Sequence, residues 1–190
     1  MRKLFGKYRG RVEDNADPQG IGRVQVSSPA GMGAGARAWA MPCMPYAEPG
    51  VGLSMLPPVG ADVWVEFEEG DVRRPIWTGF FWDSPPAPPA TTDEVTLTTR
   101  GGHRLSLSDS GNAVSVSHPA GSSVKLDATG LVEFTASSTI RLTASRVEIG
   151  AGMIELQAGA VDASGVVRCE TLLATSVIAS SYSPGAGNVW

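Results

Sequence analysis

The chain has 190 residues and a formal net charge of −4, and only 7% of its residues are aromatic. An acidic chain of this composition lacks the basic surface that nucleic-acid-binding domains normally carry. No run of 18 apolar residues predicts a membrane span, and the basic start MRKLFGKYRGRV is not followed by the apolar stretch of a signal peptide.

Five short strand patterns precede a proline-rich break and predict an all-β N-terminal domain over residues 1–83. The chain is rich in Gly and Pro, with 23 and 14 residues, which suits a turn-rich β protein. Five short strands in about 80 residues fit a small closed barrel of the OB type. The expected strands are residues 7–13, 22–28, 36–42, 61–67 and 75–82.

The charges of this domain nearly balance, with nine Lys and Arg against ten Asp and Glu. An oligonucleotide-binding barrel needs a basic groove and exposed aromatic side chains on which bases stack, and the sequence indicates neither. We therefore expect no nucleic-acid partner. The tryptophans of the strand segments are expected in the core or at an interface: Trp39, Trp64, Trp77 and Trp82.

Residues 84–94 separate the barrel from a region of different texture. The run FWDSPPAPPATTDE has four prolines and no core residues of its own. Such a segment is a stiff, extended spacer.

A short repeat begins beyond this linker. Seven units start at residues 124, 132, 140, 147, 154, 161 and 167, and each has two apolar residues, the last unit with a weaker second member, on either side of a charged one. A spacing of two is the strand period, whereas a helical heptad places apolar residues three and four apart. The charged centres are Lys125, Glu133, Arg141, Glu148, Glu155, Asp162 and Arg168. Residues 105–107 and 114–116 look like earlier, less regular members.

Residues 95–171 are predicted to form an intertwined triple-stranded β-helix, a trimeric needle. A single-chain β-helix needs around 20 residues per coil to close a loop around a core, and seven or eight cannot do so. Several chains winding around one axis can, most simply three. The charged centres would then face water. The expected trimer core consists of Val124, Leu126, Val132, Phe134, Ile140, Leu142, Val147, Ile149, Ile154, Leu156 and Val161.

Residues 172–190 leave the charged-centre pattern and end with large side chains, Tyr182, Val189 and Trp190. The end of a β-helix exposes unpaired backbone and an open core, so it must be covered. The segment is expected either to fold back as the cap or to form a platform for a separate tip protein.

No residue pattern predicts an enzyme or a cofactor. The carboxylates of EFEEGD (66–71) lie at an expected hairpin turn beside Arg73 and Arg74, and the serines lack a partnered base. The only histidines, His103 and His118, are too few and too far apart in the repeat to predict a metal site. Cys43 and Cys169 have no CxxC spacing, so we expect buried free thiols.

Two stretches of the sequence resemble a known family. GRVEDNADPQGIGRVQVSSP and WAMPCMPYAEPGVGLSMLPPVGADVWVEFEEGDVRRPIWTGFF, within residues 6–83, are similar to baseplate assembly protein V, the central spike of contractile phage tails. The same OB domain occurs in VgrG of type VI secretion. GGHRLSLSD (101–109) resembles the entry into the family's β-helix.

The resemblance implies a homotrimer whose barrels sit under a hub and whose needle points at the target envelope. Because the barrel starts the chain, it implies a separate hub protein. It also implies other baseplate proteins and a possible PAAR-type tip protein as partners. The linker is too short for the lysozyme domain of some relatives, and the His-x-His iron motif of some tips is absent.

These observations favour a structural membrane-puncturing spike, assembled in the bacterial cytoplasm as part of a phage tail or tail-like injection particle. The alternative is an OB-fold module that binds a ligand or oligonucleotide, with the repeat as an oligomerisation stalk. An envelope-degrading enzyme has no motif in its favour.

Overall fold

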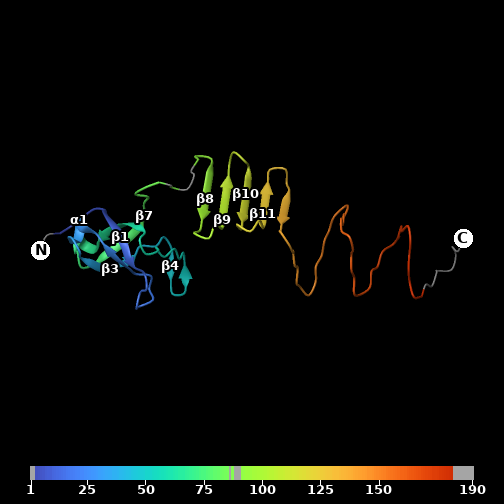
Figure 1. Ribbon diagram of the computed structural model, residues 1–190, viewed down its shortest axis with the longest axis horizontal. Helices are drawn as coiled ribbons and strands as arrows, with labels where there is room; N and C mark the ends of the chain where they lie inside the picture. The colour runs from blue at the N-terminus through green and yellow to red at the C-terminus, as the bar shows by residue number, and fades with distance from the viewer. Residues whose placement is uncertain (1–2, 86, 88–90, 182–190) are drawn as a thin grey trace. The chain divides into compact units, whose positions relative to one another are not determined.

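The computed structural model of the chain describes residues 3–85, 87 and 91–181, and the predicted tip residues Tyr182, Val189 and Trp190 lie outside them. The chain divides into two units, residues 1–140 and 141–190. The first unit contains a barrel and a separate five-stranded sheet (Figure 1).

The N-terminal domain is the predicted five-stranded closed barrel, with the strand order β1-β2-β3-β7-β6. The five predicted strands are confirmed within a few residues. The chain adds a short helix, a small hairpin and a 3₁₀ turn between them. The bounds are β1 (Tyr8–Asp14), β2 (Val24–Ser27), α1 (Pro29–Met32), β3 (Arg37–Pro42), β4 (Ala47–Glu48), β5 (Val51–Gly52), β6 (Asp62–Phe67), η1 (Glu68–Gly70) and β7 (Pro75–Phe80).

Alternation along the strands builds the barrel core. In β6 the residues alternate between half-buried and buried, so that every second side chain points inward. The buried apolar side chains are Val12, Val24, Val26, Ala40, Val63, Val65, Phe67 and Trp77. Ser28 is the buried polar residue among them, and its hydroxyl donates to the carbonyl of Arg9 at 2.8 Å.

Gly10 allows β1 to pass close over β6. A Cβ at this position would lie 2.5 Å from Cγ2 of Val65 and 3.2 Å from the carbonyl oxygen of Ser27. Only a residue without a side chain fits between these two neighbours.

The second sheet is an antiparallel meander in the order β12-β11-β10-β9-β8. Each strand pairs with the next one along the chain, and the connections are tight turns such as Asp109–Asn112, where Asn112 has φ of 43°. The bounds are β8 (Glu94–Thr98), β9 (Arg104–Ser108), β10 (Ala113–Ser117), β11 (Ser123–Asp127) and β12 (Val132–Thr135).

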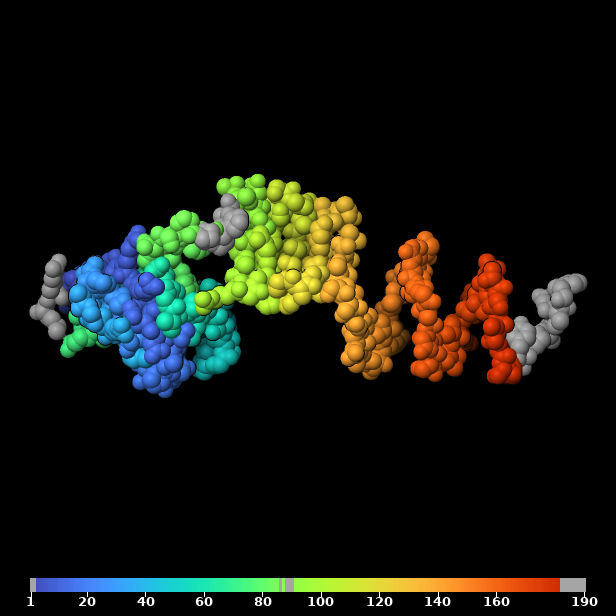
Figure 2. Space-filling model, viewed as in Figure 1, coloured from blue at the N-terminus to red at the C-terminus, as the bar shows by residue number. Residues whose placement is uncertain are grey.

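Residues 136–181 form no helix or strand, so the β-helix expected from residue 95 is not formed within one chain. Residues 94–135 pair with themselves because strands that start nine or ten residues apart leave room for a turn between strands of four or five residues. The seven-residue spacing beyond residue 140 is too short for such hairpins. Figure 2 shows residues 141–181 as a single winding layer of atoms. No helix of the described residues is long and apolar enough to cross a membrane.

Candidate interaction surfaces

One face of the β8–β12 sheet is entirely apolar. Register partners point to the same side of a sheet, and the partners here form two rows across all five strands. The first row is Val95, Leu107, Val114, Leu126 and Val132, and the second is Leu97, Leu105, Val116, Val124 and Phe134. We call these ten side chains the apolar face.

The apolar face is open to solvent. Its side chains range from 37% exposed at Leu105 to 70% at Val95, apart from the half-buried Val124. In β9 the usual pattern is inverted, because Leu105 and Leu107 are exposed while Ser106 between them is buried. Contiguous exposed apolar surface of this kind marks an interaction site.

The opposite face of the sheet is polar and internally bonded. Glu94 accepts hydrogen bonds from the Ser106 hydroxyl at 2.6 Å and from Nη2 of Arg104 at 2.8 Å, and these bonds lower the pKa of its carboxyl. Lys125 lies opposite Glu133 on the same face. The polar face is therefore suited to contact with water, whereas the apolar face is suited to contact with another protein surface.

Four of the predicted trimer-core residues, Val124, Leu126, Val132 and Phe134, lie together on the apolar face. The others, Ile140, Leu142, Val147, Ile149, Ile154, Leu156 and Val161, are all more than half exposed. None of the eleven belongs to a core within one chain. The predicted core set omitted Val95 and Leu97, which the alternation of EVTLT could have identified.

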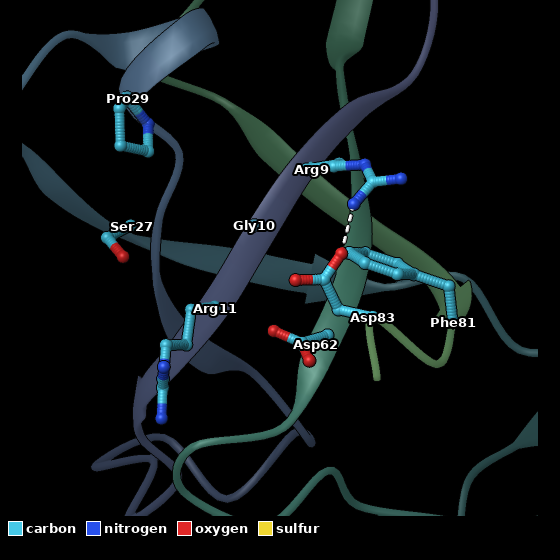
Figure 3. Close-up of a pocket in the computed structure, with 8 residues that line it drawn as sticks. All are labelled: Arg9, Gly10, Arg11, Ser27, Pro29, Asp62, Phe81 and Asp83. Atoms are coloured by element: carbon cyan, nitrogen blue, oxygen red, sulfur yellow. Dashed lines mark hydrogen bonds and ion pairs between the residues drawn. The ribbon is translucent and has the colours of Figure 1, made fainter. Parts of the chain in front are cut away.

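The barrel carries a polar pocket where the chain leaves it (Figure 3). Arg9 forms an ion pair with Asp83, and its guanidinium lies 5.0 Å from the centroid of the Phe81 ring. Phe81 in turn packs against Trp64, with ring centroids 4.7 Å apart. Trp82, expected in a strand and in the core or at an interface, lies beyond the end of β7 at Phe80 and is 70% exposed, so it is not a core residue of the chain.

Trp39, a second outward aromatic side chain of the barrel strands, is also covered. The guanidinium of Arg23 lies 5.5 Å from the ring centroid of Trp39, and Trp77 is in the core. Six basic side chains of the barrel, Lys7, Arg9, Arg23, Arg37, Arg73 and Arg74, form ion pairs with carboxylates. The paired basic side chains and the covered tryptophan rings disfavour the basic groove and the open aromatic platform that base stacking needs, and Phe80 at the end of β7, 42% exposed, is a single ring.

Asp17 organises the loop between β1 and β2. Its carboxylate accepts from the backbone N–H groups of Gln19, Ile21 and Arg23, and from Nη2 of Arg23 at 2.7 Å. Its side chain is only 5% exposed. The Arg23 guanidinium above all, and then the three N–H groups, hold the pKa of this carboxyl well below its usual range.

This loop borders an apolar groove of about 510 Å³. Ile21 forms one wall, and the β4–β5 hairpin and the chain after it form the other, with Tyr46, Val51, Leu53 and Met55 exposed. Glu48 is the single charged residue of its lining. The groove suits an apolar protein surface better than a charged ligand.

The histidines lie closer together than the sequence predicted. Arg104 and Ser117 are the last register partners of β9 and β10, so His103 and His118 meet one position beyond, with ring centroids 4.7 Å apart. Nδ1 of His118 accepts the N–H of Ala120 at 3.0 Å. Among the described residues, no three His, Cys, Asp or Glu side chains converge to hold a metal ion.

The remaining candidate residues lie at the surface. Asp71 pairs with Arg73, and Arg74 pairs with Glu68 and Glu69, so the acidic cluster is the expected ion-paired turn. Arg73 lowers the pKa of Asp71. Cys43 and Cys169 are free as expected, but both are exposed, because neither lies at an inward position of a strand.

Comparison with known proteins finds a family match for the barrel. Residues 8–82 match the injector OB domain of type VI secretion systems and phage baseplates. The match runs from the start of β1 to just beyond β7 and includes Phe81. No curated protein matches the chain.

Proposed function

We propose that the chain is the central spike of a contractile injection particle, because residues 8–82 match the injector OB domain of type VI secretion systems and phage baseplates. Three copies would associate through the apolar face and continue as an interwound needle. The proposal rests above all on the ten apolar side chains that one face of the β8–β12 sheet exposes.

Three copies cover these faces better than two. Burial of each large apolar side chain contributes about 1.5–3 kcal/mol, so covering the face is strongly favourable. The sheet is narrow, since each strand contributes two inward residues. Two such sheets face to face would leave both long sides of the core open, whereas three walls around an axis close it as a prism.

The second unit supports the same arrangement. Residues 136–181 have no strand partners within the chain, yet their repeat units carry the strand period. Backbone N–H and C=O groups need partners once they are buried. Strands from two further copies, wound around the same axis, would supply these partners while the charged centres stay in water.

The role that follows is mechanical and structural rather than enzymatic. The barrel would sit under a separate hub protein in the baseplate, and its apolar groove offers a surface for a protein partner. Contraction of the particle would drive the needle through the target cell membrane. A PAAR-type protein at the C-terminal end is the proposed tip, and assembly is expected in the bacterial cytoplasm.

The alternative, an OB module that reads an oligonucleotide, is less well supported. Phe81 covers Trp64, Arg23 covers Trp39, and most basic side chains of the barrel are paired. A ligand of this kind would have to displace these contacts.

Light scattering on the purified full chain tests the proposal. A native mass near three times 19.8 kDa, in a species that resists SDS without boiling, is expected of the interwound trimer. A 19.8 kDa species would contradict it and favour the binding module.

A further inference from the structure

The chain does not leave the barrel freely at the end of β7. Beyond Phe80 it crosses the outside of the barrel, where the N–H of Phe81 donates to the carbonyl of Asp62 at 3.4 Å. The Phe81 ring packs on Trp64 at 4.7 Å, and Asp83 forms an ion pair with Arg9 (Figure 3). We call Arg9, Trp64, Phe81 and Asp83 the exit clasp.

The exit clasp attaches residues 81–83 to the seam between β1 and β6, whereas β7 itself ends at its pairing with β6. Arg9 and Trp64 are direct register partners on β1 and β6, and their neighbours Val63 and Val65 point into the core. Arg9 and Trp64 therefore share the outer surface of these two strands. Residues 81–83 reach across β6 to β1.

The seam between β3 and β7 is the weakest closure of the barrel. It has two register pairs, Met41 with Ile76 and Pro42 with Trp77, and Pro42 has no N–H to donate. The β1–β6 and β2–β3 pairs each have four partners. The β3–β7 pair is also the parallel one, and parallel pairing is slightly less stable per residue.

A pull on the end of β7 would act first on its pairing with β6 and then on this weak seam. Phe80 is paired with Val63 of β6, so the load would peel β7 from its end toward its short contact with β3. With the clasp closed, the same load enters β1 and β6 through Arg9 and Trp64 instead. There it acts across a longer antiparallel ladder.

We propose that the exit clasp is a load-bearing anchor, which passes force between the linker and the β1–β6 seam and so protects the β3–β7 seam from peeling. This inference rests on the proposed function, because only a spike driven through an envelope puts load on the linker. The sequence of residues 84–94 suits that role, since proline-rich spacers in general transmit a push or pull with little slack.

Hydrogen exchange on the full-length assembled chain tests whether the clasp closes. Phe81→Ala and Arg9→Ala are expected to speed exchange of the backbone N–H of residue 81, which donates to Asp62, about tenfold, since each removes an aromatic or cation–π contact. Trp82→Ala is the matched control, because this neighbouring side chain is 70% exposed. Circular dichroism of each variant verifies that the barrel is folded. A further variant, Arg9→Lys, keeps the positive charge but removes the planar guanidinium.

Single-molecule pulling, with the full chain held through its two ends, tests whether the clasp carries load. The barrel of Phe81→Ala is expected to open at lower force than that of the wild type or Trp82→Ala. Unchanged exchange in Phe81→Ala and Arg9→Ala would overturn the clasp, and faster exchange with an unchanged opening force would overturn its load-bearing role. The mass measurement decides the trimeric spike separately, so a failure of either proposal can be told from a failure of the other.

Discussion

Val116 on β10 lies directly opposite Val124 on β11, and both side chains point to the apolar face. Val116 also lies opposite Leu105 on β9, so it sits in the middle of a row that crosses the sheet. It is 55% exposed in the chain alone. The side chain of Val116 contributes little burial of apolar surface until another protein surface covers it.

We therefore expect Val116→Glu to block association of the chains through the apolar face of the β8–β12 sheet. Placing a carboxylate in a dry core costs several kcal/mol unless it is paired, and each copy would add one. Light scattering should show loss of the trimer and gain of the single-chain mass. Ser115→Glu is the matched control, since its side chain points to the polar face of the same strand, and it should leave the trimer intact. Equal effects of the two substitutions would contradict the assignment of faces.

Asp17→Asn is expected to lower the melting temperature of the barrel at neutral pH. The substitution removes the charge that accepts from Arg23 and from three backbone N–H groups. The pKa of Asp17 is lowered in the folded state, so its contribution is fully present above the ordinary carboxyl pKa of 3.8 and is lost as the pH falls below it. The difference in melting temperature between wild type and variant should therefore begin to shrink below about pH 5 and keep shrinking as the pH falls toward the lowered pKa of the folded state.

Glu48→Gln serves as the control for that titration, because Glu48 is exposed in the β4–β5 hairpin, which lines the same groove as the loop of Asp17. It should melt with the wild type at every pH. A gap between Asp17→Asn and wild type that stays constant on acidification would show that the loop depends on shape and not on the charge of Asp17.

Gly10→Ala is expected to destabilise the barrel by about 1–3 kcal/mol, the usual cost of overpacking a core. The new methyl group would stand 2.5 Å from Cγ2 of Val65. Urea unfolding of the single variants and of Gly10→Ala combined with Val65→Ala measures the coupling. The glycine substitution should cost clearly less when Val65 is already truncated. Additive costs would mean that the Ser27 carbonyl, and not Val65, sets the limit.

The sequence predicted what depends on local periodicity. Alternation placed the five barrel strands, and it grouped the apolar residues on either side of Lys125 and Glu133, which lie on one face in the β11–β12 register. It could not reveal contacts made by distant parts of the chain, such as Arg9 with Asp83. The contact of His103 with His118 was missed for a related reason, because it depends on the register of β9 and β10 and not on spacing.

The same limit explains why the sequence pattern alone did not show which residues of the expected β-helix pair within one chain. Two apolar residues around a charged centre occur both in the β11–β12 hairpin and in residues 140–163, where no strand forms. The pattern fixes which side chains share a face, but the identity of the hydrogen-bonding partner depends on the length of the connection. The paired strands start nine or ten residues apart, which leaves room for a hairpin, whereas the units from residue 140 onward follow at steps of six to eight residues and are left to seek a partner in another copy.

Ile154→Asp tests that conclusion in the second unit. If Ile154 and Leu156 face a trimer core, a carboxylate there should open the needle locally, and residues 141–181 should become sensitive to a protease that the wild type resists. The β8–β12 sheets should still hold three copies together, so the native mass should not change. Glu155→Gln changes the residue between them, which would face water, and should leave protection intact. A needle segment that is cut equally fast in the wild type and in both variants would mean that residues 141–181 do not pair between chains.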